Sequence, residues 1–444
     1  MKIACLGGGP AGLYFAIAMK LRDASHEVVV FERNRADDTF GWGVVLSDET
    51  LDNLAANDAK SAAAIKAEFA YWDDIAVHHK DTCTVSSGHG FCGIGRKKLL
   101  LLLQDRAREL GVDLRFETEV ESAARYAKDY DLVVASDGLN SRTRSEYAEH
   151  FKPDIDVREC KFVWLGTHQK FDDAFTFIFE KTEKGWLWVH AYQFDADTAT
   201  FIVECTEETY ANYGFGELSQ QETIAVCEKV FAKYLGGHKL MTNANHIRGS
   251  AWLNFPRVLC ERWSHENIVL MGDAAATAHF SIGSGSKLAL ESAIALADYL
   301  HEEETLQAAF QKYEDARRLE VLRLQSAARN SLEWFENVER YLHLDPVQFN
   351  YSLLTRSQRI SHENLRLRDQ AWLEGAEQWY QRQAGAPANT ARAPMFAPYK
   401  LRGMELVNRV VVSPMAQYKA VEGAPTDWHF AHYAERAKGG AGLL

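Results

Sequence analysis

The feature that most constrains the fold is a glycine-rich turn close to the start of the sequence. The apolar run of residues 2–6 leads directly into Gly7-x-Gly9-x-x-Gly12, and a helical pattern of apolar residues follows. A second apolar run, "EVVVFERN", contains Glu32, which comes 20 residues after Gly12. Glycines at this spacing allow a tight turn, the helix N-terminus attracts a pyrophosphate, and the acid accepts hydrogen bonds from ribose hydroxyls. Because strand, turn, helix, strand and acid occur in order, the sequence predicts an α/β domain that binds a dinucleotide.

Two further strands end in an acid next to a glycine. The run "DYDLVVAS" leads into Asp137-Gly138, and the run "ENIVLM" leads into Gly272-Asp273. The carboxyl ends of parallel strands meet at one edge of a sheet, so both carboxylates are expected to reach hydroxyl groups of the same ligand. After the second of these motifs, the turn Gly283-x-Gly285 opens a long helical pattern. The three signals together predict one dinucleotide site built from segments that lie far apart in the sequence.

In this order the motifs resemble those of the FAD-dependent aromatic hydroxylases of the para-hydroxybenzoate hydroxylase type, over about residues 1–375. The resemblance implies an α/β fold in which a Rossmann-like FAD-binding domain carries an inserted, mostly antiparallel β-sheet substrate domain. It also implies FAD as cofactor, NADH or NADPH as co-substrate, O2, and a helix N-terminus that faces the pyrimidine end of the flavin. The implied cofactor contacts are Gly7, Gly9, Pro10, Ala11, Gly12, Glu32, Arg33, Trp42, Gly43, Arg96, Asp137, Gly138, Gly272, Asp273, Gly283 and Gly285.

Longer runs resemble one branch of this family. "FGWGVVLSDETLDNL", "GHGFCGIGRKKL" and "AARNSLEWFENVERYLHLDP" are similar to the branch that contains salicylyl-CoA 5-hydroxylase and 2-aminobenzoyl-CoA monooxygenase/reductase. The resemblance implies a flavin-dependent monooxygenase that hydroxylates an aromatic acyl-CoA. The chain departs from most family members in having "HFSIGSG" where they have prolines, and Glu291 where they have Asp. Alternatives are a hydroxylase of a free aromatic acid or a tryptophan-like substrate, a geranylgeranyl-reductase-like flavoprotein, and a GDI-like binding module without enzymatic activity.

Between the second and third motifs the pattern changes to alternation. "FTFIFEKTEKGWLWVHAYQF" places aromatic residues at every second position, which predicts a half-buried antiparallel sheet. Its aromatic face is expected to roof the active site, and packing in the core is the alternative role for each single residue. His279 is the first catalytic candidate because imidazole titrates near neutrality, with a hydrogen bond to the loop backbone as the alternative. His190 and Tyr192 are weaker catalytic candidates.

The sequence predicts three successive parts. The hydroxylase part is expected at residues 1–375, a Pro- and Ala-rich linker at 384–398, and a different domain at 399–444. Within the first part, we expect FAD-binding segments at about 1–160 and 250–330, the substrate sheet at about 160–250, and C-terminal helices at about 303–383.

The last part resembles the start of an FMN-binding, old yellow enzyme-type barrel. Ser413-Pro414-Met415 matches the FMN contact at the end of that family's first barrel strand, and residues 432–440 match its first helix. A complete (β/α)8 barrel needs about 250 residues. We therefore expect an incomplete barrel start here, a natural protein that continues as a fusion, and FMN binding only in a complete C-terminal domain.

The net charge and the cysteine content limit the range of possible binding partners and cellular compartments. The formal net charge of −13 argues against binding of nucleic acid or an anionic membrane. A local basic groove for CoA phosphates remains open, with a solvated helix face as the alternative; its candidates are Arg356, Arg359, Arg366 and Arg368. No apolar run of about 18 residues and no signal-peptide pattern occur, which predicts a cytoplasmic protein. The seven scattered cysteines indicate reduced thiols and no metal site, and a homodimer is left open.

Overall fold

The structure is a computed structural model that describes residues 1–444 except 40, 172–173, 244–250 and 388–392. The chain forms two compact units, Met1–Ile360 and Ser361–Leu444. No helix among the described residues combines the length and the apolar character needed to span a bilayer. The cytoplasmic location predicted from the sequence stays a prediction.

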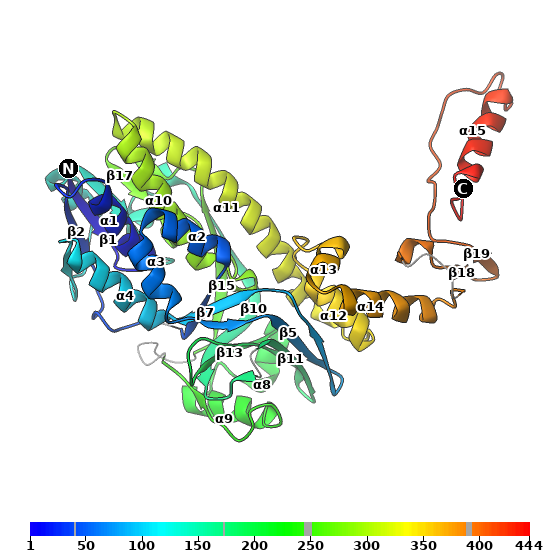
Figure 1. Cartoon of the computed structure of the whole chain (residues 1–444), viewed down its shortest axis with the longest axis horizontal. Coiled ribbons are helices and arrows are strands. Elements are labelled where there is room, and N and C mark those ends of the chain that lie inside the picture. Colours follow the sequence, from blue (N-terminus) through cyan, green and yellow to red (C-terminus); the bar gives the residue numbers. More distant parts are fainter. Residues whose placement is uncertain (40, 172–173, 244–250, 388–392) are drawn as a thin grey trace. The chain divides into compact units, whose positions relative to one another are not determined.

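A six-stranded sheet carries the three predicted motifs (Figure 1). Its order is β16-β17-β9-β1-β2-β8, and all neighbours pair in parallel except β16, which is antiparallel to β17. The strands are β1 (Lys2–Leu6), β2 (Glu27–Phe31), β8 (Asp113–Arg115), β9 (Leu132–Ala135), β16 (Ser264–His265) and β17 (Ile268–Leu270). Apart from Lys2 at the start of β1, the strands β1, β9 and β17 are buried and apolar, as is typical of a parallel sheet covered on both faces. The predicted Rossmann-like domain is confirmed.

Three helices pack beside this sheet. Two of them follow cofactor motifs, and the other follows a strand of the three-stranded sheet described below. They are α1 (Pro10–Arg22), α4 (Arg96–Glu109) and α10 (Gly285–Glu302), and α1 packs against both of the others. Shorter helices in the same part are α2 (Asp48–Asn57), α3 (Ala59–Lys66), α5 (Ala123–Asp129), α6 (Arg142–Glu146) and α7 (Ala148–Phe151). A three-stranded sheet, β3 (Gly43–Leu46), β7 (Phe91–Gly95) and β4 (Ala70–Trp72), leads into α4.

The inserted sheet is mostly antiparallel, as predicted. Its order is β14-β10-β13-β12-β11-β5-β6, with β15 paired to β10, and only β11 and β5 pair in parallel among the described strands. The strands are β5 (Asp74–His79), β6 (Thr82–Ser86), β10 (Pro153–Thr167), β11 (Ala174–Thr182), β12 (Gly185–Gln193), β13 (Ala199–Cys205), β14 (Leu240–Met241) and β15 (Leu253–Cys260).

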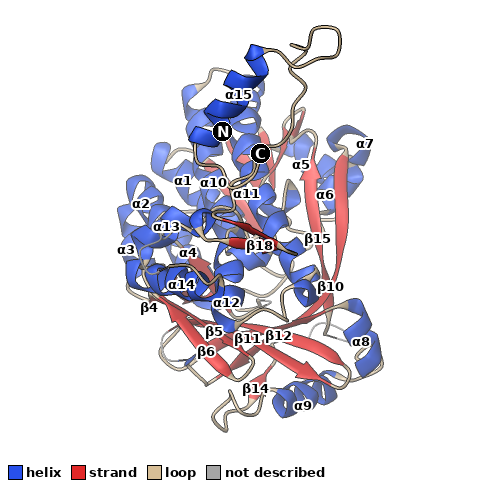
Figure 2. Cartoon of the chain, turned by 90° about the vertical axis from the view of Figure 1, so that its right-hand side faces the viewer, coloured by secondary structure: helices blue, strands red, loops and turns tan. Residues whose placement is uncertain are grey.

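Both faces of this sheet are buried, which differs from the predicted half-buried sheet. The face with Phe177 and Trp188 packs against Phe335 of the long helix α11 (Leu306–Glu336). The opposite face, with Val189 and Phe201, packs against residues from and around α8 (Glu207–Tyr213) and α9 (Gln220–Val230). Figure 2 shows α9 below the sheet and α12 (Pro346–Thr355) above it. Alternation within the strands could not reveal this, because the covering helices are encoded elsewhere in the sequence.

The C-terminal unit contains α13 (His362–Arg368), α14 (Gln370–Gln383), the hairpin β18 (Tyr399–Leu401) and β19 (Met404–Leu406), and α15 (Asp427–Lys438). Val411 and Leu443 form a parallel bridge on either side of α15. Two parallel segments joined through a helix have the connection of a β/α unit. The FMN-binding barrel itself stays a prediction.

Candidate functional site

A cavity of about 280 Å3 lies where the glycine turn, the end of β2 and the end of β9 meet. Its lining includes Gly7, Gly9, Pro10, Glu32, Arg33, Arg96, Asp137 and Gly138. These residues come from the glycine turn, the end of β2, the second motif and the start of α4, whereas Ala11 and Gly12 do not line the cavity. The structure therefore brings together Gly7, Gly9 and Glu32 of the first motif with the second motif.

The glycines of the turn have different steric surroundings. Gly7 has a φ of +112°, and an added Cβ would lie 2.3 Å from the carbonyl oxygen of Ser136. A Cβ on Gly12 would lie 2.2 Å from the carbonyl oxygen of Gly7. A Cβ on Gly9, the N-cap of α1, would meet no atom within 4 Å. Gly7 and Gly12 thus let the turn pack against β9, whereas Gly9 keeps the backbone accessible from the cavity, as a pyrophosphate at the helix N-terminus requires.

Glu32 closes the turn from the end of β2. Its Oε2 accepts from the backbone nitrogen of Gly8 at 2.8 Å, and its Oε1 accepts from that of Asn34 at 2.8 Å. The carboxylate is thus oriented by the backbone while it lines the cavity. This geometry fits an acid that presents its remaining lone pairs to ribose hydroxyls.

Asp137 and Arg144 organise the second motif. Asp137 Oδ2 accepts from the backbone nitrogen of Thr143 at 3.1 Å and from its hydroxyl at 3.2 Å. Its Oδ1 is buried and has no partner among the described residues, so it is an acceptor for a ligand donor. The buried Arg144 donates to the carbonyl oxygens of Leu139 at 2.5 Å and Ala274 at 3.0 Å. Sequence reasoning gave Arg144 no role, although it closely follows Asp137-Gly138.

Asp273, in the third motif, is an exposed residue, but its carboxyl group is surrounded by protein atoms. Partial desolvation raises the pKa of its carboxyl, and the positive charges of Arg96 and Arg144 oppose this shift. Burial lowers the pKa of Arg96, while the charge of Asp273 acts in the opposite direction. The backbone nitrogen of Arg96 donates to the carbonyl oxygen of Trp42 at 2.8 Å. The first turn of α4, the Gly41-Trp42-Gly43 segment and the third motif therefore belong to one neighbourhood.

The segment after the third motif places His279 beside two phenylalanines. The His279 ring centroid lies 4.2 Å from that of Phe280 and 4.8 Å from that of Phe255. Its Nδ1 accepts from the backbone nitrogen of Ser281 at 3.2 Å. Burial lowers the pKa of His279 well below its usual value. This hydrogen bond corresponds to the loop-bracing alternative, and a catalytic role for His279 stays a prediction. Gly283 follows with a φ of +63°, and Gly285 begins α10.

Tyr192 connects the substrate sheet to the Gly41-Trp42-Gly43 segment. Its hydroxyl donates to the carbonyl oxygen of Gly43 at 2.8 Å, and the Gly43 nitrogen donates to Thr200 Oγ1 at 3.0 Å. Burial raises the pKa of Tyr192 to about 12. The Trp42 ring lies over Gly166, where an added Cβ would be 2.7 Å from the indole. Trp42 and Gly43 are therefore held by the sheet that the sequence expected above the flavin.

His190 is paired with a buried acid that the sequence analysis did not select. His190 Nε2 lies 3.0 Å from Glu204 Oε2, and Trp188 Nε1 donates to the same oxygen at 2.7 Å. His190 is 2% exposed and Glu204 is 1% exposed. The His190 ring centroid lies 5.6 Å from that of Phe280, so the pair borders the segment after the third motif. The available signal was a single acid within the otherwise uncharged run of residues 199–205, all of which are buried in β13.

Arg356 is an interior residue, which corrects its expected place in a groove for CoA phosphates. It donates to the carbonyl oxygen of Ser281 at 2.8 Å and lies 5.2 Å from the ring centroids of both Phe177 and Phe335. Burial lowers the pKa of Arg356 to about 10, and the charge of Glu204 opposes this shift. In the C-terminal unit, Arg366 is bound to Glu377 at 2.6 Å. These contacts neutralise or enclose two of the four arginines that formed the candidate basic face.

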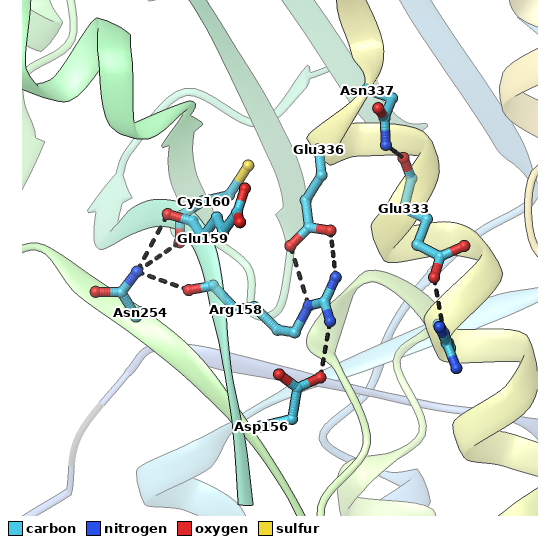
Figure 3. A network of polar contacts seen from close by, with 9 residues as sticks. Asp156, Arg158, Glu159, Cys160, Asn254, Glu333, Glu336 and Asn337 are labelled. Atoms are coloured by element: carbon cyan, nitrogen blue, oxygen red, sulfur yellow. Dashed lines mark hydrogen bonds and ion pairs between the residues drawn. The ribbon is translucent and has the colours of Figure 1, made fainter.

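A polar network fixes α11 against the strand that borders the site (Figure 3). Arg158 on β10 is bound to Glu336 at the end of α11, with distances of 3.1 and 2.5 Å, and to Asp156 at 2.7 Å. Asn254 on β15 donates to the carbonyl oxygens of Arg158 at 2.7 Å and Glu159 at 3.2 Å, where the register of β10 and β15 shifts. The network thereby sets the end of α11, which carries Phe335 next to His190.

Ser413, Pro414 and Met415 lie in the C-terminal unit outside any described helix or strand. Met415 is 72% exposed. Their expected contact with FMN stays a prediction.

Comparisons with known proteins cover both parts of the chain. The family model described as FAD binding domain matches residues 1–327, and the model described as NADH:flavin oxidoreductase / NADH oxidase family matches residues 394–444. The chain is 40% identical over 422 residues to a salicyloyl-CoA 5-hydroxylase of Streptomyces sp, covering 93% of this chain and 79% of the relative. It is 35% identical over 363 residues to a protodeoxyviolaceinate monooxygenase of Chromobacterium violaceum, covering 81% and 95% of the two chains.

A third relative and a solved structure agree with these matches. The chain is 34% identical over 336 residues to a 3-hydroxy-4-methyl-anthranilyl-(aryl-carrier protein) 5-monooxygenase of Streptosporangium sibiricum, covering 76% of this chain and 89% of the relative. The tetrameric form of 2-methyl-3-hydroxypyridine-5-carboxylic acid oxygenase is similar in structure, with a TM-score of 0.64 and 18% identity. That match covers 84% of this chain and 98% of the other, and at this identity it shows the fold alone.

Proposed function

The chain belongs to the FAD-dependent aromatic monooxygenases, and we propose that it hydroxylates an aromatic acyl-CoA, salicylyl-CoA or 2-aminobenzoyl-CoA, with NADH and O2. The observation that carries this proposal is the 40% identity to a salicyloyl-CoA 5-hydroxylase over 93% of the chain. A second relative is named for an anthranilyl group on an aryl-carrier protein. Both names describe an aryl acid joined to a large carrier, which supports a substrate of the same kind here.

The residues around the cavity fit FAD. Gly9 leaves its backbone accessible, Glu32 has a fixed carboxylate, and Asp137 has a buried oxygen without a partner among the described residues. Gly9 and Glu32 would hold the ADP half, and Asp273 would hold the ribityl chain. Asp137 would contact both FAD and the nicotinamide, and Arg96 would be a further cofactor contact. When bound, FAD accepts electrons from the nicotinamide and activates O2 for ring hydroxylation. The contribution of the chain is to bind the cofactor, orient the substrate and exclude water.

The aromatic face of the inserted sheet provides the environment for the substrate ring. Phe177 and Phe280, on different segments, each make a ring contact with His190. A planar aryl group can stack among such side chains, while its polar carrier extends away from them. His190, His279 and Tyr192 remain the catalytic candidates, although His279 and Tyr192 make hydrogen bonds to the backbone.

The C-terminal segment supports the proposal that the natural protein has a second flavin domain. Residues 394–444 match the NADH:flavin oxidoreductase / NADH oxidase family model. In the proposal these residues begin an FMN-binding domain that reduces the dearomatised product of the hydroxylase. A cytoplasmic location and a homodimer are further parts of the proposal.

The test is NADH oxidation by the purified, FAD-loaded protein with salicylyl-CoA, 2-aminobenzoyl-CoA and the two free acids. We expect a thioester to stimulate NADH oxidation and to yield a product heavier by one oxygen atom. A protein that hydroxylates the free acids as efficiently as the thioesters contradicts the CoA assignment. Equal activity on a tryptophan-like compound favours the alternative of a tryptophan-like substrate. Family membership excludes the non-enzymatic, GDI-like alternative.

A further inference from the structure

The three catalytic candidates differ in what their polar atoms contact. Tyr192 uses its hydroxyl to bind the carbonyl oxygen of Gly43, and His279 uses Nδ1 to accept from the backbone of Ser281. Among the described residues, only His190 of the three is hydrogen-bonded to a carboxylate. This difference separates a side chain that can exchange a proton from two that hold backbone segments in place.

The contact with Glu204 fixes the tautomer of His190. An imidazole nitrogen that faces a carboxylate carries the proton, so Nε2 donates to Glu204 Oε2 across 3.0 Å. In the neutral ring Nδ1 then retains its lone pair and is a proton acceptor. Trp188 Nε1 donates to the same carboxylate oxygen at 2.7 Å, which keeps Glu204 in position. The carboxylate holds one nitrogen of the imidazole, and the other nitrogen is unprotonated. This arrangement is typical of an oriented general base.

Packing alone does not account for an acid at this position. Glu204 on β13 is 1% exposed and lies opposite Trp188 of β12, and the rings of Trp188 and His190 both contact Phe335. Burial of a carboxylate costs free energy, and an apolar side chain of similar volume fills such a position at no electrostatic cost. The acid is thus explained by the charge that it brings to His190.

The other charged and titratable groups around the pair come from three further segments. Arg356 follows α12, His279 precedes α10 and Cys160 lies on β10, while Cys205 is the neighbour of Glu204 on β13 itself. Arg356 donates to Ser281, Ser331 and Leu353, so its hydrogen bonds are directed away from Glu204. Burial and the charge of Arg356 lower the pKa of His190, and Glu204 opposes both effects. Glu204 is therefore the group that favours a proton on His190.

We propose that Glu204 is a positioning residue that makes His190 the proton acceptor for the ring hydroxyl of a salicylyl substrate. This inference rests on the proposed function and deepens it. The O–H bond of the substrate breaks, its proton passes to His190 Nδ1, and the electron pair stays on the oxygen. The phenolate then donates electron density to the para carbon, which is position 5 of the ring, where oxygen is added. Glu204 stabilises the imidazolium that results.

The test compares the full chain with its Glu204→Gln variant, using salicylyl-CoA and the FAD-loaded proteins. The amide keeps the shape of Glu204 but removes its charge. We expect hydroxylation to fall by about 100-fold, because general-base catalysis contributes factors of this order. The rate of flavin reduction by NADH should stay within about twofold of the parent, since the hydroxyl proton of the substrate is not transferred in that step.

The pH profile provides a readout that a structural role does not change. A general base must be unprotonated, so the rate of hydroxylation falls as pH drops through the pKa of His190. Removal of the Glu204 charge lowers that pKa, and the acid limb of the variant should move to lower pH. Glu204→Asp keeps the charge and should restore part of the rate. The proposal is overturned if Glu204→Gln keeps both the parent rate and the parent acid limb.

A second buried pair offers a matched control. In the C-terminal unit, His362 Nε2 lies 2.8 Å from Glu377 Oε1, and Glu377 is 2% exposed. Glu377→Gln should leave both the hydroxylation rate and its pH profile unchanged; an equal change in both variants would overturn the proposal. If Glu204→Gln does not retain FAD, His190→Gln replaces it in the same comparison. A parent protein that does not hydroxylate salicylyl-CoA at all contradicts the proposed function itself, which distinguishes the two failures.

Discussion

The guanidinium of Arg144 donates to the backbone carbonyl oxygen of Asp273 at 3.3 Å. Arg144 follows the second cofactor motif, and Asp273, 129 positions later in the chain, belongs to the third, so this contact joins the two sequence signals. A second bond, to the carbonyl of Ala274 at 3.0 Å, strengthens the same connection. The edge of the sheet that receives the cofactor is thus fixed by a buried cation as well as by strand pairing.

Arg144→Met should destabilise the protein by about 2–4 kcal/mol, because it leaves buried carbonyl groups without donors. It should also reduce FAD retention, since the positions of Asp137 and Asp273 then depend on strand pairing alone. Urea unfolding and the flavin absorbance of the purified protein measure the two effects. The control is Arg329→Met, whose ion pair with Glu333 is exposed and should matter by less than about 1 kcal/mol. Similar unfolding midpoints for the two variants would exclude the role given to Arg144.

Gly9→Ala and Gly12→Ala should fail in different ways. A Cβ on Gly9 meets no protein atom within 4 Å, so this variant should fold normally and bind FAD about tenfold or more weakly. A Cβ on Gly12 would lie 2.2 Å from the Gly7 carbonyl oxygen, so that variant should lose thermal stability even without cofactor. Circular dichroism of the apoproteins and FAD titration separate the two outcomes. Equal thermal midpoints for both apoproteins would contradict this assignment.

Tyr192→Phe distinguishes a structural hydroxyl from a catalytic one. The hydroxyl binds the Gly43 carbonyl oxygen at 2.8 Å, and its loss should cost about 1–3 kcal/mol of stability because a buried acceptor loses its donor. The amount of hydroxylated product per NADH consumed should change by less than about threefold, since general acid–base residues contribute far larger factors. A loss of about 100-fold in product yield would instead place Tyr192 in the chemistry.

The buried histidines predict how stability depends on pH. Burial lowers the pKa of His279 and of His190 below the usual value of 6.5. Below about pH 6.5 the unfolded state binds protons that the folded state does not. The free energy of unfolding should therefore decrease by about 1.4 kcal/mol for each histidine as the pH is lowered by one unit. His279→Asn keeps an acceptor for the Ser281 nitrogen and should reduce this dependence between pH 6.5 and 5.5. Unfolding measured across that range tests the prediction, and an unchanged slope in the variant would refute it.

The sequence predicted the elements whose signals are local. The turn at Gly7 to Gly12 and the motifs at Asp137 and Asp273 could be recognised because strand, glycine and acid are adjacent in the chain. Arg144 and Glu204 could not be assigned in this way, because their roles depend on contacts with Asp273 and His190 in other segments of the chain. The pattern of the inserted sheet gave its alternation correctly, whereas the burial of its second face depends on helices that follow later.

Arg356 illustrates the same limit from the opposite side. In the sequence it stands in a run with three other arginines, which left open either a basic groove for CoA phosphates or a solvated helix face. In the fold its guanidinium lies 5.2 Å from the ring centroids of Phe177 and Phe335. Spacing along the chain indicates which residues share a helix face, but it does not show which arginine at the end of a helix turns toward an aromatic core.

The most direct test of the central claim is turnover under 18O2 with NADH and equal concentrations of salicylyl-CoA and free salicylate. If the carrier supplies binding energy remote from the ring, its removal should lower turnover as well as affinity. We therefore predict one 18O atom in the ring of the thioester product and at least about 100-fold less labelled product from the free acid. Equal labelling of the two compounds, or NADH oxidation without labelled product from the thioester, would contradict the assignment as an aromatic acyl-CoA hydroxylase.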